Sequence, residues 1–469
     1  MTIPRISLAA THSGSGKTTI TAGIISALTN RGLTVQAFKT GPDYIDTGFH
    51  TLASGRPARN LDTVLTDKDA VLELFTRSAG DADIAVIEGV MGLYDGLSGS
   101  DEKGSTAHTA KLLGSPVVLC LDAGAMARSA AAVALGFLKF DPELNLAGFI
   151  LNKIAGEHHL GLVKGPIEAA TGLPVLGYFP GDKELAMPER HLGLTPAWEK
   201  GGLPESLVKA AKYAETHIDL DRLLAIAQAA PELPAVTPRI FTGRVFPEGQ
   251  DKVRIAYAYD DAFHFYYEDN LDILKDLGAE LVPFSPVHDA RLPEHIGGLY
   301  FGGGYPELLA PQLEANKPMR SAVREAARKG LPVYAECGGL MYLMEKLKTF
   351  GGESYSMAGV FKGSVRMTDR LAALGYYKAR AVADSVIAEK GWEIWGHVFH
   401  WSLLENLPDM YSPSLRLSAP ERQDVSDGLA AGSVMAGYFH IHFAADLRWP
   451  ARFVRKCSER FKSAAGSAG

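Results

Sequence analysis

Residues 9–19 read Ala-Ala-Thr-His-Ser-Gly-Ser-Gly-Lys-Thr-Thr, a glycine-rich stretch that ends in Gly-Lys-Thr. It follows an apolar run at residues 3–9 and precedes a helical pattern at residues 18–28. A turn at this junction suits phosphate, because N–H groups at a helix start point outward and the helix dipole favours an anion. We expect a nucleotide site, although Thr11 replaces the usual first glycine; a glycine turn without a ligand is the alternative. The expected contacts are Gly14, Ser15, Gly16, Lys17, Thr18 and Thr19, with Lys17 on the terminal phosphate and Thr18 on Mg²⁺.

Acidic residues follow two further apolar runs, at residues 35–38 and 84–87. Parallel sheets bind ligands at the carboxyl ends of their strands, and Mg²⁺ prefers a few hard oxygen ligands with phosphate and water. We therefore expect Asp46 and Glu88 to hold Mg²⁺ together with Thr18. Asp43 and Asp95 are expected to position substrate or phosphate, so that the four acids form the catalytic set of this edge.

Three other residues near strand ends are expected to contact the nucleotide or the substrate. Lys39 follows residues 35–38 directly and is expected to contact the nucleotide. Asn152 follows the apolar run 146–151 and suits a contact with the base, although asparagine is also common in turns for local reasons. Tyr44 lies among the acids and is expected to contact the substrate.

Cys337 stands between an apolar run at residues 331–335 and a small-residue helix start, Gly338-Gly339-Leu340. A nucleophile elbow has this order of strand, nucleophile, small residues and helix. The sharp turn exposes the thiol, and the helix N-terminus lowers the thiol pKa. Upstream, a glycine triplet follows the apolar run 298–301 and can aim N–H groups at an oxyanion. We predict a cysteine nucleophile with an oxyanion hole from Gly303, Gly304 and Gly338.

Two histidine pairs follow Cys337 and could supply its base. They are His397 with His400 in Gly-His-Val-Phe-His, and His440 with His442 in Tyr-Phe-His-Ile-His. A metal site is the rival explanation, but no cysteine or acid cluster accompanies either pair.

The order of apolar runs and helical patterns predicts an α/β protein with two doubly wound domains. In the first half, short runs at residues 35–38, 84–87, 117–121, 146–151 and 175–178 are apolar on both faces, which is typical of covered parallel strands. Proline-rich residues 231–251 predict a linker, with domains at 1–230 and 252–460. A flexible tail is expected at 461–469, and a helix between residues 216 and 230 is expected to pack on the first domain.

Composition narrows the class of partner and the compartment. The chain has 469 residues, 46% of them hydrophobic, and a formal net charge of -7, which argues against nucleic acid as the main partner. Its three cysteines have no zinc-ligand spacing, and such sparse use predicts a reducing compartment. The chain start lacks a signal-peptide pattern, and no apolar run approaches the roughly 20 residues that span a bilayer. We therefore expect a cytoplasmic protein with no membrane partner.

Nine strings together resemble the cobyrinic acid a,c-diamide synthase family over nearly the whole chain. In the first half they are FKTGPDYID (38–46), RNLD (59–62), EGVMGLYDG (88–96), GSTA (104–107) and PERHLGL (188–194). In the second half they are FGGGYPEL (301–308), AECGGLMYL (335–343), GHVFHWS (396–402) and YFHIHF (438–443).

The resemblance implies a dethiobiotin-synthetase-like ATP domain joined to a class I glutamine amidotransferase domain. Such enzymes amidate the a and c acetate side chains of a corrin precursor, with nitrogen from L-glutamine and carboxylate activation by ATP and Mg²⁺. In this chain Cys337 aligns with the nucleophile and His440 with the general base. Ordinary class I glutaminases place a glutamate two residues after that histidine, where this chain has His442, so a Cys–His dyad is expected.

The resemblance does not determine which tetrapyrrole is the substrate or which side chains bind it. The family motif Gly-His-Glu-Phe-His has Val398 in place of glutamate here, so the substrate preference can differ. The polyanionic substrate needs local cations in an acidic chain, and Arg59, Arg190 and His191 are the candidates.

Other functions remain as alternatives. Ni-sirohydrochlorin amidation belongs to the same family, whereas cobyric acid synthases fit the GPDYID and PERHLGL strings less well. A regulatory ATP-binding protein with an inert glutaminase-like domain is the alternative from another class, and an intact Cys337 and His440 argue against it. The sequence does not determine the oligomeric state, and a homodimer is one of the alternatives.

Overall fold

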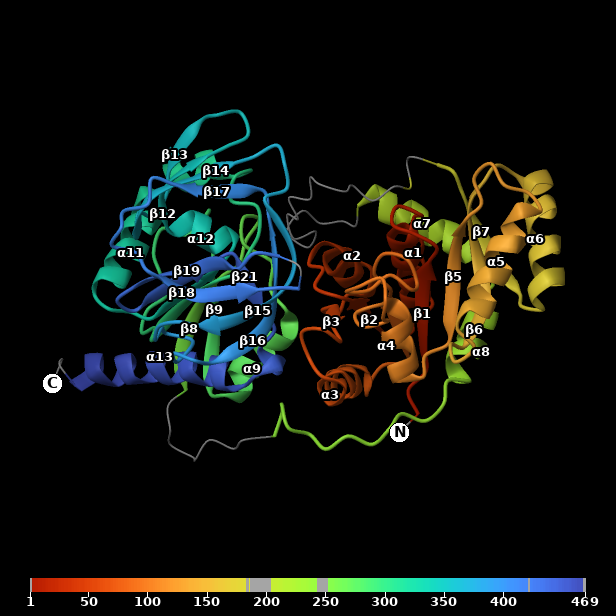
Figure 1. Ribbon diagram of the computed structural model, residues 1–469, viewed down its shortest axis with the longest axis horizontal. Coiled ribbons are helices and arrows are strands. Elements are labelled where there is room, and N and C mark those ends of the chain that lie inside the picture. The colour runs from red at the N-terminus through yellow and green to blue at the C-terminus, as the bar shows by residue number, and fades with distance from the viewer. Residues whose placement is uncertain (1, 183–184, 186–203, 243–251, 421, 467–469) are drawn as a thin grey trace. The chain divides into compact units, whose positions relative to one another are not determined.

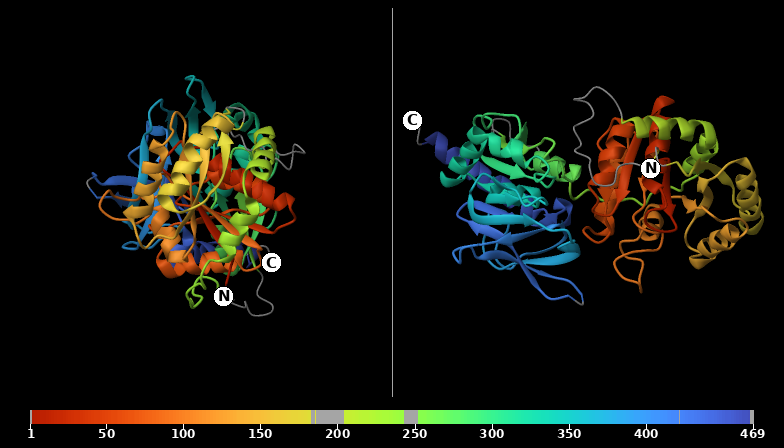
Figure 2. Two further views of the ribbon diagram at one scale, coloured as in Figure 1. Left: turned by 90° about the vertical axis from the view of Figure 1, so that its right-hand side faces the viewer. Right: turned by 90° about the horizontal axis from the view of Figure 1, so that it is seen from above.

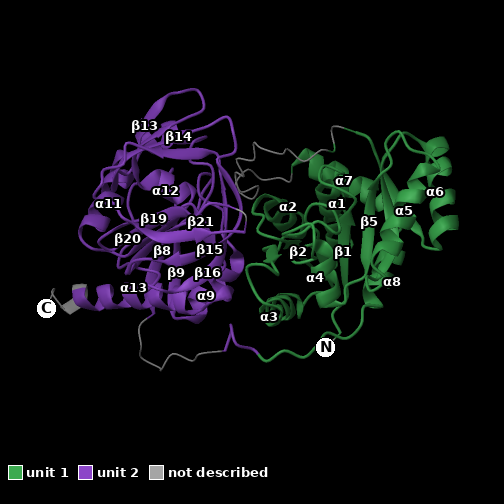
Figure 3. Ribbon diagram, viewed as in Figure 1, with its two compact units in different colours: residues 1–192, 197–237 green, residues 193–196, 238–469 purple. Residues whose placement is uncertain are grey.

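The computed structural model describes residues 2–182, 185, 204–242, 252–420 and 422–466, and the fold is given for these residues (Figure 1). The chain divides into two compact units, and the described residues up to 237 belong to unit 1 and those from 238 to unit 2 (Figure 3). Both units are α/β, and each is described by itself. Among the described helices, none combines the length and the apolar character that crossing a membrane requires.

Within its described residues, unit 1 contains a parallel sheet of seven strands in the order β3-β2-β4-β1-β5-β6-β7. The strands are β1 (Arg5–Ala10), β2 (Val35–Thr40), β3 (Arg59–Leu61), β4 (Ile84–Glu88), β5 (Val117–Asp122), β6 (Leu146–Ile154) and β7 (Val175–Pro180). The helices are α1 (Lys17–Asn30), α2 (Ile45–Ser54), α3 (Lys68–Ala79), α4 (Thr106–Leu113), α5 (Ser129–Phe140), α6 (Glu157–Thr171), α7 (Glu205–His217) and α8 (Leu220–Gln228). The five parallel strands predicted from apolar runs are confirmed as β2, β4, β5, β6 and β7.

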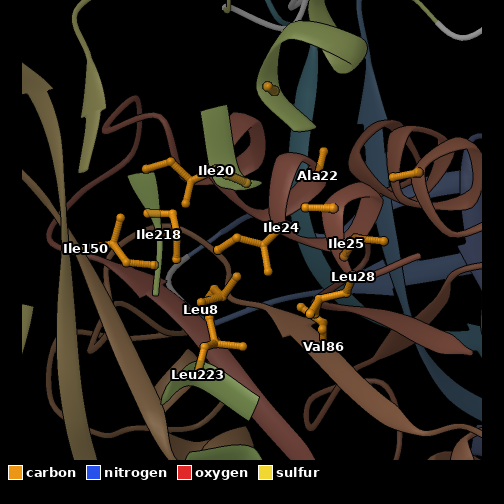
Figure 4. Packing of buried hydrophobic residues seen from close by; sticks show 14 of the residues in the cluster. Leu8, Ile20, Ala22, Ile24, Ile25, Leu28, Val86, Ile150, Ile218 and Leu223 are labelled. Atoms are coloured by element: carbon orange, nitrogen blue, oxygen red, sulfur yellow. The ribbon is translucent and has the colours of Figure 1, made fainter. Parts of the chain in front are cut away.

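Helices cover both faces of this sheet, as the further views in Figure 2 show. On one face, Leu8 of β1 and Val86 of β4 lie with Ile24 of α1 and Leu223 of α8 in a buried cluster (Figure 4). Since Leu223 is part of this core, α8 packs on unit 1, as the sequence predicted. The opposite face is covered by α4, α5 and α6. Because β1 lies centrally between β4 and β5, the loop that follows it opens at the carboxyl edge of the sheet.

Unit 2 contains, among its described residues, a mixed sheet of ten strands in the order β21-β16-β15-β18-β19-β20-β11-β10-β8-β9 and a smaller sheet in the order β13-β12-β14-β17. The strands of the larger sheet are β8 (Val253–Ala258), β9 (Ala279–Phe284), β10 (Gly298–Phe301), β11 (Val333–Glu336), β15 (Ala373–Ala381), β16 (Glu393–His400), β18 (Pro413–Ser418), β19 (Val425–Ala431), β20 (Val434–Gly437) and β21 (Phe439–Ile441). Those of the smaller sheet are β12 (Met344–Lys348), β13 (Ser354–Ser356), β14 (Phe361–Met367) and β17 (Ser402–Glu405). The helices are α9 (Glu268–Asp276), α10 (Ala310–Ala315), α11 (Lys317–Arg328), α12 (Gly338–Leu343) and α13 (Arg448–Gly466), with a short 3₁₀ turn at Phe443–Ala445.

The larger sheet of unit 2 differs from a purely parallel, doubly wound one. Strands β9, β8, β10, β11 and β20 are parallel, whereas β15, β16, β18, β19 and β21 pair antiparallel. Helix α13 continues to Gly466, into the segment predicted as a tail.

Candidate functional site

The phosphate loop joins β1 to α1. Gly14 and Gly16 have φ of 78° and 84°, in the left-handed region that glycine adopts without a steric penalty. A Cβ on Gly16 would clash with Nδ2 of Asn152. That Nδ2 donates to the Ser15 carbonyl at 2.8 Å. Asn152 of β6 therefore contacts the phosphate loop and fixes the loop backbone at Ser15. Thr18 and the half-buried Thr19 follow in the first turn of α1.

Lys17 is the first residue of α1, and its side chain reaches the loop after β4. Its Nζ donates to the carbonyl of Met91 at 3.1 Å. Burial lowers the pKa of Lys17, and the nearby Lys39 ammonium lowers it further. A buried ammonium at a helix start is well placed to pair with a phosphate anion.

A buried cluster of charged groups lies behind the loop, centred on Glu88 at the end of β4. Glu88 Oε1 accepts hydrogen bonds from Thr18 Oγ1 at 2.9 Å and from Lys39 Nζ at 3.0 Å. Lys39 Nζ also lies 2.7 Å from Oδ2 of Asp46. On the other side, His50 Nε2 lies 2.6 Å from Glu88 Oε2. The four predicted residues Thr18, Glu88, Lys39 and Asp46 are thus linked by successive contacts, with His50 as an unpredicted fifth member.

Opposite charges in this cluster stabilise the ionised forms of Lys39 and Glu88. Burial would raise the pKa of Glu88, but the Lys39 charge and the contact with His50 outweigh it and hold that pKa well below its usual range. Burial would lower the pKa of Lys39, but Asp46 and Glu88 outweigh it and raise that pKa. For Asp46, burial is the largest cause, and it raises the pKa to about 7 against the opposing effect of Lys39. Glu88 and Lys39 are therefore held as ions, and Asp46 is the acid that most readily takes up a proton.

The donor set fits a hard divalent cation in part. The Thr18 hydroxyl and the Glu88 carboxylate are oxygen ligands that adjoin at 2.9 Å, whereas the Asp46 carboxylate is engaged by Lys39. Within the described part of the chain, no group of three or more His, Cys, Asp or Glu side chains is arranged to hold a metal. A magnesium ion here would take its remaining ligands from nucleotide phosphates and water.

Asp43 and Asp95 make local hydrogen bonds at the same edge. Asp43 Oδ1 accepts from the backbone N–H groups of Ile45 and Asp46 at 2.7 and 2.9 Å, and so caps α2. Asp95 Oδ2 accepts from the N–H of Gly92 at 2.9 Å. Both carboxylates thus order the loops that carry them.

Of the four residues predicted to contact the substrate, the structure describes two. Tyr44 directly precedes α2 and is half-buried, and Arg59 opens β3 and is half-buried. Arg190 and His191 lie outside the described residues.

In unit 2, Cys337 forms the predicted elbow between β11 and α12. Its backbone has φ 48° and ψ −102°, a conformation that is rare for a residue with a side chain. The N–H of Cys337 donates to the carbonyl of Gly437 at 2.7 Å, which fixes the elbow against β20. Its Sγ lies 3.7 Å from the carbonyl of Phe399 in β16. Such an elbow turns the thiol out of the sheet at the start of a helix.

His440 in β21 is buried and contacts the Cys337 thiol. Its Nδ1 lies 3.2 Å from Oε2 of Glu336, the residue directly before the nucleophile. The sequence predicted a dyad because His442 occupies the usual acid position. The structure instead brings a carboxylate to His440 from β11.

The glycine turn after β10 lies against the start of α12. A Cβ on Gly338 would lie 3.0 Å from the Gly304 amide nitrogen, and a Cβ on Gly303 would lie 3.0 Å from Cε1 of His440. The N–H of Gly303 donates to the Phe265 carbonyl at 3.3 Å. Of the three predicted oxyanion donors, Gly304 and Gly338 therefore adjoin, whereas the Gly303 N–H is engaged elsewhere and Gly303 leaves room for the imidazole.

Of the remaining histidines of the two pairs, His397 and His442 are buried and His400 is half-buried, and all three are kept neutral. Burial lowers the pKa of His397 and of His442 to about 3, and that of His400 to about 4. The His400 ring stacks on Tyr438, with centroids 3.7 Å apart. Val398 is 3% exposed in β16, so the glutamate of the family motif would stand at a buried position here.

Comparison with known proteins follows the division into two units. Residues 6–194 match the model of the CobQ/CobB/MinD/ParA nucleotide binding domain, and residues 254–447 match that of the CobB/CobQ-like glutamine amidotransferase domain. The cobyrinate a,c-diamide synthase of Dehalococcoides mccartyi (strain ATCC BAA-2266 / KCTC 15142 / 195) is 46% identical over 460 residues, which cover 97% of this chain and 98% of that protein. The chain belongs to the cobyrinate a,c-diamide synthase family. Similar proteins of that name occur in Listeria monocytogenes serotype 4b (46% identical, 94% of this chain and 97% of that protein) and in Picrophilus torridus (41%, 97% and 99%).

Two residues of this cobyrinate a,c-diamide synthase family member were missed by sequence reasoning. Glu336 ends an apolar strand, and an ionisable group in such a run is costly unless it is paired, which is a usable signal. His50 lies on the buried face of α2, and its contact with Glu88 depends on tertiary structure alone.

Proposed function

We propose that the chain catalyses the ATP- and glutamine-dependent amidation of the a and c acetate carboxylates of cobyrinic acid or hydrogenobyrinic acid in cobalamin biosynthesis. The observation that carries the proposal is the presence in one chain of a phosphate loop beside the Glu88 cluster and of a buried Cys337–His440 pair. The names of relatives that match over nearly the whole chain support the corrinoid substrate.

The glutaminase half-reaction takes place in unit 2. The Cys337 thiolate attacks the side-chain amide carbon of L-glutamine and forms a tetrahedral oxyanion, toward which the Gly304 and Gly338 N–H groups donate. Protonated His440 gives its proton to the departing ammonia, which leaves a glutamyl thioester on Cys337. Water, deprotonated by His440, then hydrolyses the thioester and releases glutamate.

The synthetase half-reaction takes place in unit 1. A carboxylate is a poor acyl donor because it would have to expel oxide, so it is first converted to an acyl phosphate. The substrate carboxylate oxygen attacks the γ-phosphorus of ATP, ADP leaves, and ammonia then attacks the acyl carbon and displaces phosphate. Lys17 and Lys39 supply positive charge where the phosphoryl group moves. Thr18 and Glu88 would hold Mg²⁺, which supplies charge neutralisation on the phosphates when bound.

The test is mass spectrometry of the products formed from cobyrinic acid, hydrogenobyrinic acid and Ni-sirohydrochlorin with ATP and glutamine. The proposal predicts two successive amidations of one of the two corrinoids, each replacing a hydroxyl by an amino group. Amidation of Ni-sirohydrochlorin without amidation of either corrinoid would contradict the corrinoid assignment. No amide from any of the three, together with no glutamate release, would favour a regulatory protein.

A further inference from the structure

Glu336 is a buried acid that is fully engaged by hydrogen-bond donors around His440. Its side chain is 1% exposed. Oε1 accepts from the Tyr334 hydroxyl at 2.7 Å and from the backbone N–H of Ile441 at 3.4 Å. Oε2 faces Nδ1 of His440 at 3.2 Å. A carboxylate buried in this way is stable only because donors surround it.

The chain path explains why this acid reaches the imidazole. Glu336 is the last residue of β11, where it pairs with Gly437 of β20. His440 lies in β21, three residues after Gly437. Tyr334 and Glu336 lie two apart in β11, so their side chains share one face of the strand. Cys337 then turns sharply at the elbow. Two consecutive residues thereby contact His440, namely Glu336 through its carboxylate at Nδ1 and Cys337 through its thiol.

We propose that Glu336 is the positioning residue of the glutaminase half-reaction, in place of the acid that ordinary class I glutaminases carry two residues after the histidine. The proposal rests on the proposed function of unit 2. With Nδ1–H donated to Glu336, the imidazole presents Nε2 to the Cys337 thiol. The carboxylate also stabilises the imidazolium that forms when the thiol gives up its proton.

The electrostatics of His440 agree with this arrangement. Burial would lower the pKa of His440, but its hydrogen bonds with Cys337 and Glu336 outweigh burial and raise that pKa to about 10. Among the described residues, His397 and His400 on β16 and Asp427 on β19 also interact electrostatically with the imidazole. Both of these histidines are neutral because burial lowers their pKa values.

Two other residues could have oriented the His440 imidazole, but both make hydrogen bonds to other groups. Asp427 accepts hydrogen bonds from the backbone N–H groups of Tyr438 and Phe439 at 3.1 and 2.9 Å. His442 accepts through Nδ1 from the N–H of Ala444 at 3.3 Å, and burial lowers its pKa to about 3. A neutral imidazole cannot supply the negative charge that stabilises an imidazolium.

The test compares Glu336→Gln with the wild-type full-length chain in a glutamate-release assay across pH, with ammonia-dependent amidation measured in parallel. The glutamine side chain keeps the shape but removes the charge. We expect kcat to fall about 10²–10⁴-fold, the loss typical of a disabled general acid–base group. The KM for glutamine should stay within about threefold, the alkaline pKa of kcat/KM should move to lower pH, and ammonia-dependent amidation should be retained.

His442→Gln is the matched control, because it alters the position at which ordinary class I glutaminases carry the acid. It should leave the alkaline pKa at its wild-type value. A Glu336→Gln variant with wild-type kcat and an unshifted alkaline pKa would overturn the proposal. A wild-type chain that releases no glutamate from glutamine would instead refute the proposed function.

If Glu336→Gln does not fold, as judged by its tryptophan fluorescence, Glu336→Asp decides the question. The shorter aspartate side chain keeps the negative charge but places it farther from Nδ1 of His440. We expect an intermediate kcat and an alkaline pKa below that of the wild type. Wild-type values of both quantities in Glu336→Asp would contradict a positioning role.

Discussion

Lys39 Nζ lies 3.0 Å from Glu88 Oε1, and both side chains are buried from solvent. The same ammonium lies 2.7 Å from Asp46, so one cation balances two acids at the carboxyl edge of the sheet. Removing one partner of a buried ion pair leaves an uncompensated charge, which is more costly than losing a surface pair.

Substituting Lys39→Met should therefore destabilise unit 1 by about 3–5 kcal/mol, because Asp46 and Glu88 would lose their shared cation. Urea unfolding followed by far-UV circular dichroism measures this loss. The matched control is Arg31→Ala, which breaks surface pairs with Glu215 and Asp221 and should cost no more than about 1 kcal/mol. Equal losses in the two variants would show that the buried cluster does not stabilise the unit.

Lys17→Ala should abolish amidation whether glutamine or ammonia supplies the nitrogen. The lysine charge is needed where phosphoryl transfer builds negative charge, and that step precedes the use of ammonia. Glutamate release should persist, since Cys337 and His440 belong to the other unit. Retained ammonia-dependent amidation in this variant would argue against an acyl phosphate.

Acidification should destabilise unit 2 through its buried neutral histidines. The folded-state pKa of His397 and of His442 is lowered to about 3 by burial, whereas an unfolded histidine titrates near 6.5. Below pH 6.5 the unfolded chain binds protons that the folded chain cannot, so stability is lost as the pH falls from there toward about 3. Each histidine should cost about 1.4 kcal/mol for each pH unit in this window.

Urea titrations at about pH 7 and about pH 5.5, followed by tryptophan fluorescence, measure this effect in unit 2. Four of the five tryptophans lie in that unit, namely Trp392, Trp395, Trp401 and Trp449. The variant His442→Phe should show a smaller loss between the two pH values. Equal free energies of unfolding for the wild type at both would contradict burial of neutral imidazoles.

The sequence predicted the parts of the fold and site that depend on local pattern. Strands that are apolar on both faces and motifs at their carboxyl ends were recognisable, and Lys39, Asp46 and Glu88 do meet. The three-residue strand β3 was missed because Arg59 and Asn60 give it no apolar run. Antiparallel strands of unit 2 such as β15 were missed because β15 alternates buried and exposed residues and so has no continuous apolar run.

Which side chains pair through tertiary contact could not be read from the chain. The sequence predicted a cysteine–histidine dyad from the residue two places after His440, yet the carboxylate beside that imidazole comes from residue 336, more than 100 positions earlier. The Gly303 N–H was expected in the oxyanion hole, but its bond to Phe265 depends on how two distant loops pack.

Arg190→Ala should raise the KM for the tetrapyrrole and leave the KM values for ATP and glutamine little changed. A guanidinium pairs with a carboxylate in a bidentate fork, and an acidic chain needs such cations to hold a polycarboxylate. Steady-state kinetics with each substrate varied in turn measures the three constants. A variant that loses folding stability with an unchanged tetrapyrrole KM would assign Arg190 a structural role.

Under the proposed function, unit 2 makes ammonia and unit 1 uses it. The direct test is the rate of amide formation by Cys337→Ala with ATP and cobyrinic acid, measured once with glutamine and once with a high concentration of ammonium salt. We expect no product above background with glutamine and near wild-type product formation with ammonia. A variant that is equally inactive with both nitrogen sources would contradict the division of the reaction between the two units.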